Sequence, residues 1–247
     1  MINCTGASTC KLGICLPRGL SDAIRDRLED SKLDLDQLTN FRLNMSGCPN
    51  TCGMHHIAHL GFFGKIGRHK ETSDIYPSYN VMIGAKVGAG KTEYAQRKGE
   101  VAARYIPDFS HDFLEAYLLK KDEYEDYSEF IDEEGEDLVK RLCEKYSETP
   151  SYEEDNDFYK DFGAKKKLSL DELGSAECSA GLFDMIDVDK KAIVAAKKVL
   201  EEPDSDQEEL YYKILFHASR MLLVTRGIDA QTDETAFEMF GKHFLEH

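Results

Sequence analysis

Hydrophobic and polar residues follow two different periods in the first half of the chain. After Pro17, apolar residues recur at helical spacing and predict a helix over residues 17–31. Residues 41–45 alternate between apolar and polar side chains, which indicates a strand. Residues 60–66 and 79–83 predict two further strands. This half of the chain is therefore expected to combine strands and helices.

The second half is predominantly helical in pattern. Residues 107–147 predict helices on both sides of a break at Gly135. Residues 148–175 are acidic and polar, with few apolar anchors, and predict a linker lying over the surface. Helical spacing then returns and continues to the end of the chain.

The change from mixed to helical sequence indicates the domain organisation. We expect an α+β fold with a mixed sheet and helices, followed by a small all-α bundle. Further helices are predicted at residues 188–202, at residues 205–226 and from Thr232. The expected segments are a first domain at 1–147, an acidic linker at 148–185 and a truncated helical domain at 186–247.

Composition excludes several classes of protein. The formal net charge of −16 disfavours nucleic acid as a partner, because phosphate contacts need basic residues. There is no signal peptide and no run of 18 apolar residues, so we expect a cytoplasmic protein without a membrane partner. The first cysteine lies at position 4, and residues 245–247 match the start of a histidine-tag scar. We expect this chain to be a piece of a longer protein.

Cysteines are concentrated near the start of the chain. Cys4 and Cys10 form a Cys-x5-Cys pair, and Cys48 and Cys52 form a Cys-x3-Cys pair on a turn with Pro49. Such clustering favours metal binding over disulfides, and thiolates suit zinc, copper or iron–sulfur clusters. Both spacings are wider than the Cys-x2-Cys of zinc ribbons, while a cubane cluster needs four thiolates at tetrahedral corners. Zinc and iron–sulfur therefore both remain open at this point.

Other candidate ligands carry weaker signals. A short helix is predicted over residues 51–58, and on a helix His55 and His59 would lie one turn apart and could chelate zinc. Packing or surface exposure is the favoured interpretation of both histidines. Cys15, Cys143 and Cys178 lack partners at a useful spacing and are interpreted as ordinary thiols.

The two cysteine segments together resemble a known signature. Cys4-Thr-Gly-Ala-Ser-Thr-Cys10 and Gly47-Cys48-Pro49-Asn50-Thr51-Cys52-Gly53 resemble the signature of sirohaem-dependent sulfite and nitrite reductases. The strand before the second pair and the segments at 57–64 and 79–84 also look like those of the family. The resemblance covers roughly residues 1–147, and it concerns the C-terminal, cluster-binding half of these enzymes.

The resemblance implies a definite chemistry. It implies that Cys4, Cys10, Cys48 and Cys52 hold a 4Fe-4S cluster, and that the Cys52 thiolate is also the axial ligand of the sirohaem iron. Asn50 would help to fix the turn, with backbone N–H groups directed at cluster sulfur. The implied activity is six-electron reduction of sulfite to sulfide or of nitrite to ammonia. The implied electron donor is ferredoxin or a flavoprotein.

The same resemblance predicts what this chain lacks. Enzymes of the family consist of two related halves with sirohaem between them, and their substrate-binding basic residues come largely from segments that precede the cysteines. We therefore expect little activity from this chain without the missing N-terminal half. Lys65, Arg68 and Lys70 could meet haem carboxylates, but solvated surface charges are the favoured interpretation. The alternative function is a non-catalytic iron–sulfur or zinc module whose helical tail docks a partner.

The helical tail carries a weaker resemblance of its own. Tyr211-Tyr212, the segments at 216–220 and 240–244, and a break at Gly227 look like the HEPN helical-bundle family. Some members are ribonucleases that use an Arg followed four to six residues later by His, and Arg220 and Arg226 have no such His. The resemblance therefore implies a fusion or interaction module.

Overall fold

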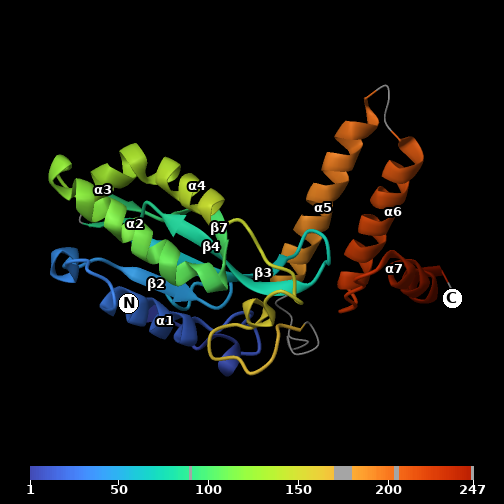
Figure 1. Ribbon diagram of the computed structural model, residues 1–247, viewed down its shortest axis with the longest axis horizontal. Coiled ribbons are helices and arrows are strands. Elements are labelled where there is room, and N and C mark those ends of the chain that lie inside the picture. The colour runs from blue at the N-terminus through green and yellow to red at the C-terminus, as the bar shows by residue number, and fades with distance from the viewer. Residues whose placement is uncertain (89–90, 170–179, 203–205, 246–247) are drawn as a thin grey trace.

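A five-stranded mixed sheet forms the centre of the larger part of the molecule. Figure 1 shows the computed structural model, which describes residues 1–88, 91–169, 180–202 and 206–245. The strand order is β1-β2-β3-β4-β7. The strands are β1 (Ile2–Asn3), β2 (Leu43–Ser46), β3 (Leu60–Arg68), β4 (Ile75–Ile83) and β7 (Gln96–Ala102). A separate hairpin pairs β5 (Lys86–Gly88) with β6 (Lys91–Glu93).

The direction of the strands decides where the loops meet. β1 and β2 run parallel, as do β2 and β3, whereas β4 is antiparallel to both β3 and β7. Parallel neighbours have their carboxyl ends at the same edge of a sheet. The loops that follow β1 and β2 therefore emerge side by side. The mixed sheet confirms the predicted α+β class.

Helices cover the sheet and complete the core. They are α1 (Pro17–Glu29), α2 (Ile106–Lys120), α3 (Tyr127–Phe130) and α4 (Glu136–Lys145). Helix α1 starts with Pro at its first position, where no backbone N–H is needed, and buries Leu20, Ile24 and Leu28 at helical spacing. Phe109 of α2 packs edge-on against Phe62 of β3, with ring centroids 6.2 Å apart. The helix predicted after Pro17 is confirmed.

The helical break predicted at Gly135 is absent. A short π-helix at Ile131–Gly135 joins α3 directly to α4. A Cβ at position 135 would lie 2.9 Å from the side chain of Ile131 and 3.2 Å from that of Ile83. Gly135 therefore permits close packing of the helical segment on β4, and it does not end a helix.

The segment predicted to be a surface linker is anchored in the described part at 148–169. Phe158 and Tyr159 are buried and pack against Tyr76 of β4. Asp161 is also buried. The acidic composition hides these anchors, because their burial depends on residues far away in the sequence. Residues 170–179, which belong to the same predicted linker, lie outside the described residues.

The described residues of the tail form α5 (Ala180–Leu200), α6 (Gln207–Val224) and α7 (Asp233–Phe240), and α7 continues into a π-helical turn at Gly241–Leu245. Figure 1 shows α5 and α6 as a hairpin that projects from the end of the sheet where β3 ends and β4 begins. Asp189 of α5 and Arg220 of α6 are both buried and form an ion pair. Arg68 of β3 pairs with Asp229, which follows α6, at 2.8 Å. The tail is thus joined to the sheet through buried charges. Within the described residues, none of the helices has the length and apolar character needed to cross a membrane.

Candidate metal centre

The sheet topology brings the two cysteine pairs together. Cys4 directly follows β1, and Cys48 follows β2 after a single glycine. The backbone N–H of Cys4 donates to the carbonyl of Met45 at 3.2 Å, continuing the parallel ladder. The N–H of Gly47 donates to the sulfur of Cys4 at 3.2 Å. One cysteine of each pair is therefore fixed at the same edge of the sheet.

The loop that carries Cys10 is tied to the second pair. The N–H groups of Ile14 and Cys15 both donate to the carbonyl of Gly47 at 2.9 Å. Gly6 has a φ of +58°, and a Cβ at this position would lie 2.3 Å from the carbonyl oxygen of Cys15. Only glycine fits such a close approach of two backbone segments. The loop therefore closes over the end of β2, next to Cys48.

A tight turn presents Cys48 and Cys52. The N–H of Thr51 donates to the carbonyl of Pro49 at 2.9 Å, and the N–H of Met54 donates to that of Thr51 at 2.8 Å. Thr51 and Met54 both have positive φ, at 31° and 57°. The helix predicted over residues 51–58 is therefore wrong, because left-handed residues interrupt it, and one 3-10 turn at His55–Ile57 remains.

The charges that act on the pKa of Cys48 indicate that the four thiols lie near one another. Burial raises the pKa of Cys48 above its usual value, the Asn50 backbone N–H lowers it, and Cys4, Cys10 and Cys52 raise it further. The backbone N–H of Asn50 thus acts on the sulfur of Cys48. Cys48 is buried, Cys4 is half-buried, and Cys10 and Cys52 are exposed. The donor set suits a soft, thiolate-bound centre.

The spacing of the thiols helps to separate zinc from a larger cluster. Four sulfurs around one zinc ion, each about 2.3 Å from the metal, lie within about 4 Å of one another. Among the described residues, the group of His, Cys and acidic side chains with ligand atoms all within 4.8 Å is His111, Asp112 and Glu115, which contains no cysteine. No three of the four cysteine sulfurs, all of which lie in the described residues, are therefore within 4.8 Å of one another.

Neither histidine of the candidate zinc pair is placed as a ligand. His55 is fully buried, and its Nδ1 lies 2.8 Å from the hydroxyl of Ser46. His59 accepts a hydrogen bond from the N–H of Arg42 through its Nδ1, at 3.1 Å, and its ring packs on Phe41. Burial lowers the pKa of both imidazoles to about 4. Both side chains are therefore packed inside the fold, in agreement with the favoured interpretation.

Two of the three basic residues that follow the Cys48–Cys52 turn are not surface charges. Lys65 is 5% exposed and pairs with Glu100 of β7 at 2.7 Å, and Arg68 is 8% exposed and pairs with Asp229. The sequence-based interpretation as solvated charges is wrong for both, because Glu100 of β7 meets Lys65 and Asp229 of the tail meets Arg68. Lys70 is exposed. All three line a cleft of about 580 Å³ that also includes Lys191 of α5.

Two further residues at the site were missed from the sequence. Ser46, at the end of β2, accepts a hydrogen bond from the N–H of Gly53 at 2.9 Å. Asp161 accepts from the N–H of Leu16, just before α1, at 2.6 Å and from that of Phe162 at 2.8 Å. For Ser46, the signal in the sequence was a polar residue at the end of a buried strand. Nothing local in the sequence distinguishes Asp161 from the acidic residues around it.

The remaining cysteines are accounted for as far as they are described. Cys15 is fully buried, with its sulfur 3.6 Å from the carbonyl oxygens of Lys65 and Ser78. Cys143 is half-buried, and burial raises its pKa. Cys178 lies outside the described residues. Cys15 and Cys143 therefore behave as the packed thiols that were predicted.

Asp161 gives the stability of the chain a specific pH dependence. Burial raises the pKa of Asp161 to about 6, so the folded chain holds this proton between about pH 4 and 6 and the unfolded chain does not. Its contribution to stability is present below pH 4 and is lost as the pH rises through 6. We expect Asp161→Asn to have a lower free energy of unfolding than the wild type at pH 4. At pH 7 this difference in free energy is expected to have shifted by about 3 kcal/mol in favour of the variant. Denaturant unfolding at both pH values measures this change.

Asp157→Asn is the matched control for that comparison. Asp157 is exposed, and its hydrogen bond from Lys160 lowers its pKa, so its contribution has the opposite sign. The free energy of unfolding of Asp157→Asn is therefore expected to fall slightly further below that of the wild type as the pH rises. A gap between Asp161→Asn and the wild type that stays constant from pH 4 to 7 contradicts the assignment.

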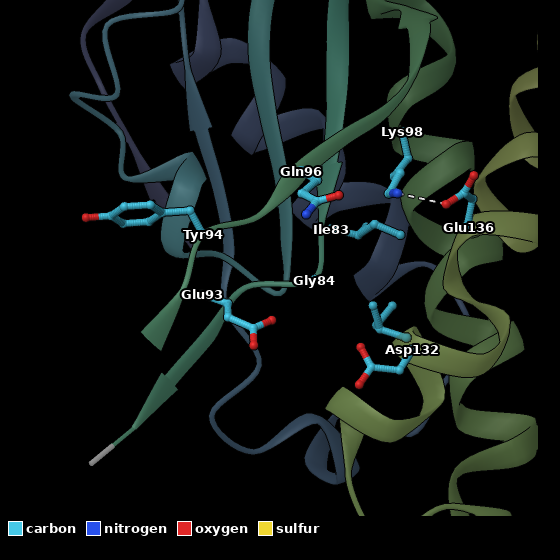
Figure 2. A pocket seen from close by; sticks show the side chains of 9 residues that line it. Ile83, Gly84, Glu93, Tyr94, Gln96, Lys98, Asp132 and Glu136 are labelled. Atoms are coloured by element: carbon cyan, nitrogen blue, oxygen red, sulfur yellow. Dashed lines mark hydrogen bonds and ion pairs between the residues drawn. The ribbon is translucent and has the colours of Figure 1, made fainter. Parts of the chain in front are cut away.

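A second, smaller cavity lies away from the cysteines. It has a volume of about 180 Å³ and is lined by residues around the root of the β5–β6 hairpin and the short π-helix between α3 and α4, including Gly84, Glu93 and Asp132. Figure 2 shows Lys98 beside Glu136 at its rim, and the two pair at 2.7 Å. Lys86 pairs with Asp132 at 2.7 Å. These acidic groups are neutralised by lysines, and no cysteine lines the cavity.

Comparison with known proteins identifies a family for residues 1–151. The family model described as "Nitrite and sulphite reductase 4Fe-4S domain" matches residues 1–151. The assimilatory ferredoxin-dependent nitrite reductase of Haloferax mediterranei is 22% identical over 143 residues, which are 58% of this chain and 24% of that protein. The sulfite reductase (NADPH) hemoprotein beta-component of Bacillus pumilus is 27% identical over 133 residues, or 52% of this chain and 21% of that protein.

A solved structure is also similar. The structure of the Mycobacterium tuberculosis NirA protein aligns with a TM-score of 0.47 at 23% identity, covering 56% of this chain and 26% of that one. The chain spans about a quarter of the length of the curated relatives named above.

Proposed function

We propose a function from one premise: the chain belongs to the nitrite and sulphite reductase 4Fe-4S domain family. Curated relatives carry names of ferredoxin-dependent nitrite reductases and of a sulfite reductase component. The chain is accordingly proposed to be the cluster-binding part of an oxidoreductase that reduces nitrite or sulfite.

Cys4, Cys10, Cys48 and Cys52 are proposed to bind one 4Fe-4S cluster. The observation that carries the proposal is the meeting of both cysteine pairs at the carboxyl ends of the parallel strands β1 and β2. Backbone N–H groups of Gly47 and Asn50 on the sulfurs of Cys4 and Cys48 support it further, because such donors stabilise thiolate charge and tune the potential.

Cys52 is proposed to be the thiolate shared with the iron of sirohaem. It is exposed, whereas Cys48 is buried, so a macrocycle lying outside this part of the chain can reach it. When bound, the paired cofactors supply the one-electron transfers that add up to six electrons for sulfite or nitrite. The protein's part is to hold the Cys52 turn rigidly at the end of β2. Lys65, Arg68 and Lys70, which line the cleft at the end of β3, are proposed as partners for haem carboxylates.

The complete activity is proposed to require more than this chain. Because the chain spans about a quarter of its curated relatives, we assign the anion-binding site and the cover over sirohaem to the rest of a reductase. The proposed substrate is sulfite or nitrite, and the proposed electron donor is ferredoxin or a flavoprotein. The tail at 186–247 is proposed to act as an interaction module, and its likeness to HEPN bundles stays a prediction.

Anaerobic reconstitution with iron and sulfide tests the proposed centre. The full chain is expected to take up about four iron and about four sulfide per molecule and to develop broad absorption in the near-ultraviolet and visible. With reduced methyl viologen as donor, the loaded chain alone is expected to turn over little sulfite or nitrite. Stoichiometric binding of a single zinc ion with no uptake of iron would contradict the proposal.

A further inference from the structure

A buried polar cluster closes the turn that carries the cysteines. Ser46 lies two residues before Cys48, and Gly53 lies one residue after Cys52. The N–H of Gly53 donates to the Ser46 hydroxyl at 2.9 Å, so one hydrogen bond joins the two ends of the turn. A Cβ on Gly53 would lie 1.9 Å from the carbonyl oxygen of Met45, which shows how closely the returning chain lies against β2.

A second polar residue of β2 supports the same segment. The side-chain amide of Asn44 donates to the carbonyl of Met54 at 3.1 Å. Asn44 and Ser46 are each 1% exposed and, two residues apart on a strand, point to the same face of the sheet. Both side chains therefore hold main-chain groups directly after Cys52.

His55 is the remaining member of this buried polar group, and its burial costs free energy. It is fully buried, with its Nδ1 on the Ser46 hydroxyl at 2.8 Å. Its Nε2 is buried and has no hydrogen-bond partner among the described residues. The ring stacks on Phe63 of β3 at 4.9 Å and lies 4.3 Å from the ring of His56. An apolar residue of similar size would fill this space without leaving a polar atom unpaired, so packing alone does not explain a histidine here.

We propose that His55 is a positioning residue of the metal centre: it orients the Ser46 hydroxyl, which fixes the Gly53 N–H and with it the main chain that carries Cys52. The Ser46 oxygen has two lone pairs and one proton, so it can accept from Gly53 while it is bonded to His55. Without the imidazole, the hydroxyl is free to rotate, and the hydrogen bond from Gly53 that fastens the turn is weakened. The consequence for a cluster rests on the proposed function, whereas the fastening itself is a property of the chain without any metal.

The apo chain provides the first readout. The exchange rate of the Gly53 amide, measured by NMR, is expected to rise about tenfold in His55→Leu and in Ser46→Ala, because each change weakens or removes one buried hydrogen bond. His55→Asn keeps a polar group near the position of Nδ1 and is expected to restore most of the protection. His56→Leu is the matched control for His55→Leu, because it makes the same change at the neighbouring ring, and it is expected to leave the Gly53 amide as in the wild type.

The reconstituted chain provides the second readout. Iron release to a chelator is expected to be about tenfold faster in His55→Leu than in His55→Asn, with a shifted reduction potential in His55→Leu. Unchanged Gly53 exchange in His55→Leu, or equal effects of His55→Leu and His55→Asn, would overturn the assignment of His55. Failure of the wild type to load iron would instead refute the proposed cluster and leave the amide-exchange result standing by itself.

Discussion

Cys48→Ser is expected to abolish iron uptake on reconstitution, lowering it from about four atoms per chain to almost none. Cys48 is the buried member of the group, and the other three thiols all act on its pKa. A serine hydroxyl is a hard and weakly acidic ligand, so it does not replace a thiolate on iron. Iron and sulfide analysis of the reconstituted variant measures the loss.

Two comparisons make that result specific. Cys143→Ala removes a half-buried thiol of α4 and is expected to bind iron like the wild type. Cys52→Ser is expected to lose the cluster too, and with it any binding of sirohaem. Full iron content in Cys48→Ser, or its loss in Cys143→Ala, is incompatible with the proposed ligand set.

Arg220→Ala is expected to lower the free energy of unfolding by about 3–5 kcal/mol. Arg220 donates to Asp189 through its Nε at 2.9 Å, and Asp189 is completely buried. Burial by itself would raise the pKa of Asp189, but hydrogen bonds from His217 and Arg220 outweigh it and keep the pKa below its usual value. Removing the arginine leaves this carboxylate buried with one cationic partner fewer. Guanidinium unfolding followed by circular dichroism at pH 7 measures the effect.

Matched variants separate charge from packing in the tail. Lys213→Ala breaks an exposed pair with Glu209 on the same helix and is expected to change stability by at most about 0.5 kcal/mol. The double change Asp189→Leu with Arg220→Met replaces the buried pair with apolar groups and is expected to recover much of the loss. If Arg220→Ala costs no more than Lys213→Ala, the buried pair does not hold the tail together.

The sequence predicts the parts of this molecule that are determined locally. The helix after Pro17 and the strand before Cys48 follow from periodicity, and the cysteine pairs follow from spacing. Strand β1, by contrast, spans only Ile2–Asn3, too short for any periodic signal, yet its parallel pairing with β2 places Cys4. A two-residue strand of this kind can be recognised only once the sheet is known.

Interactions between distant segments account for what the sequence does not predict. Asp161 stands in an acidic, polar stretch, and its burial arises because it accepts a hydrogen bond from Leu16, 145 residues earlier. Lys65 and Arg68 look like ordinary surface charges in sequence, and they are buried because Glu100 and Asp229 meet them in space. Composition describes a segment on its own, whereas burial depends on its neighbours in the fold.

The contact between Arg68 and Asp229 has a consequence for the order of events during synthesis. The four cysteines and the strands that place them are complete by residue 68, whereas the carboxylate that neutralises Arg68 comes 161 residues later. At 5–20 residues per second, that interval is roughly 8–32 seconds. During this time the cysteine loops are already made while the end of the β3–β4 hairpin still lacks the tail. The proposed metal centre can therefore assemble on the emerging chain before the last helices cover that end of the sheet.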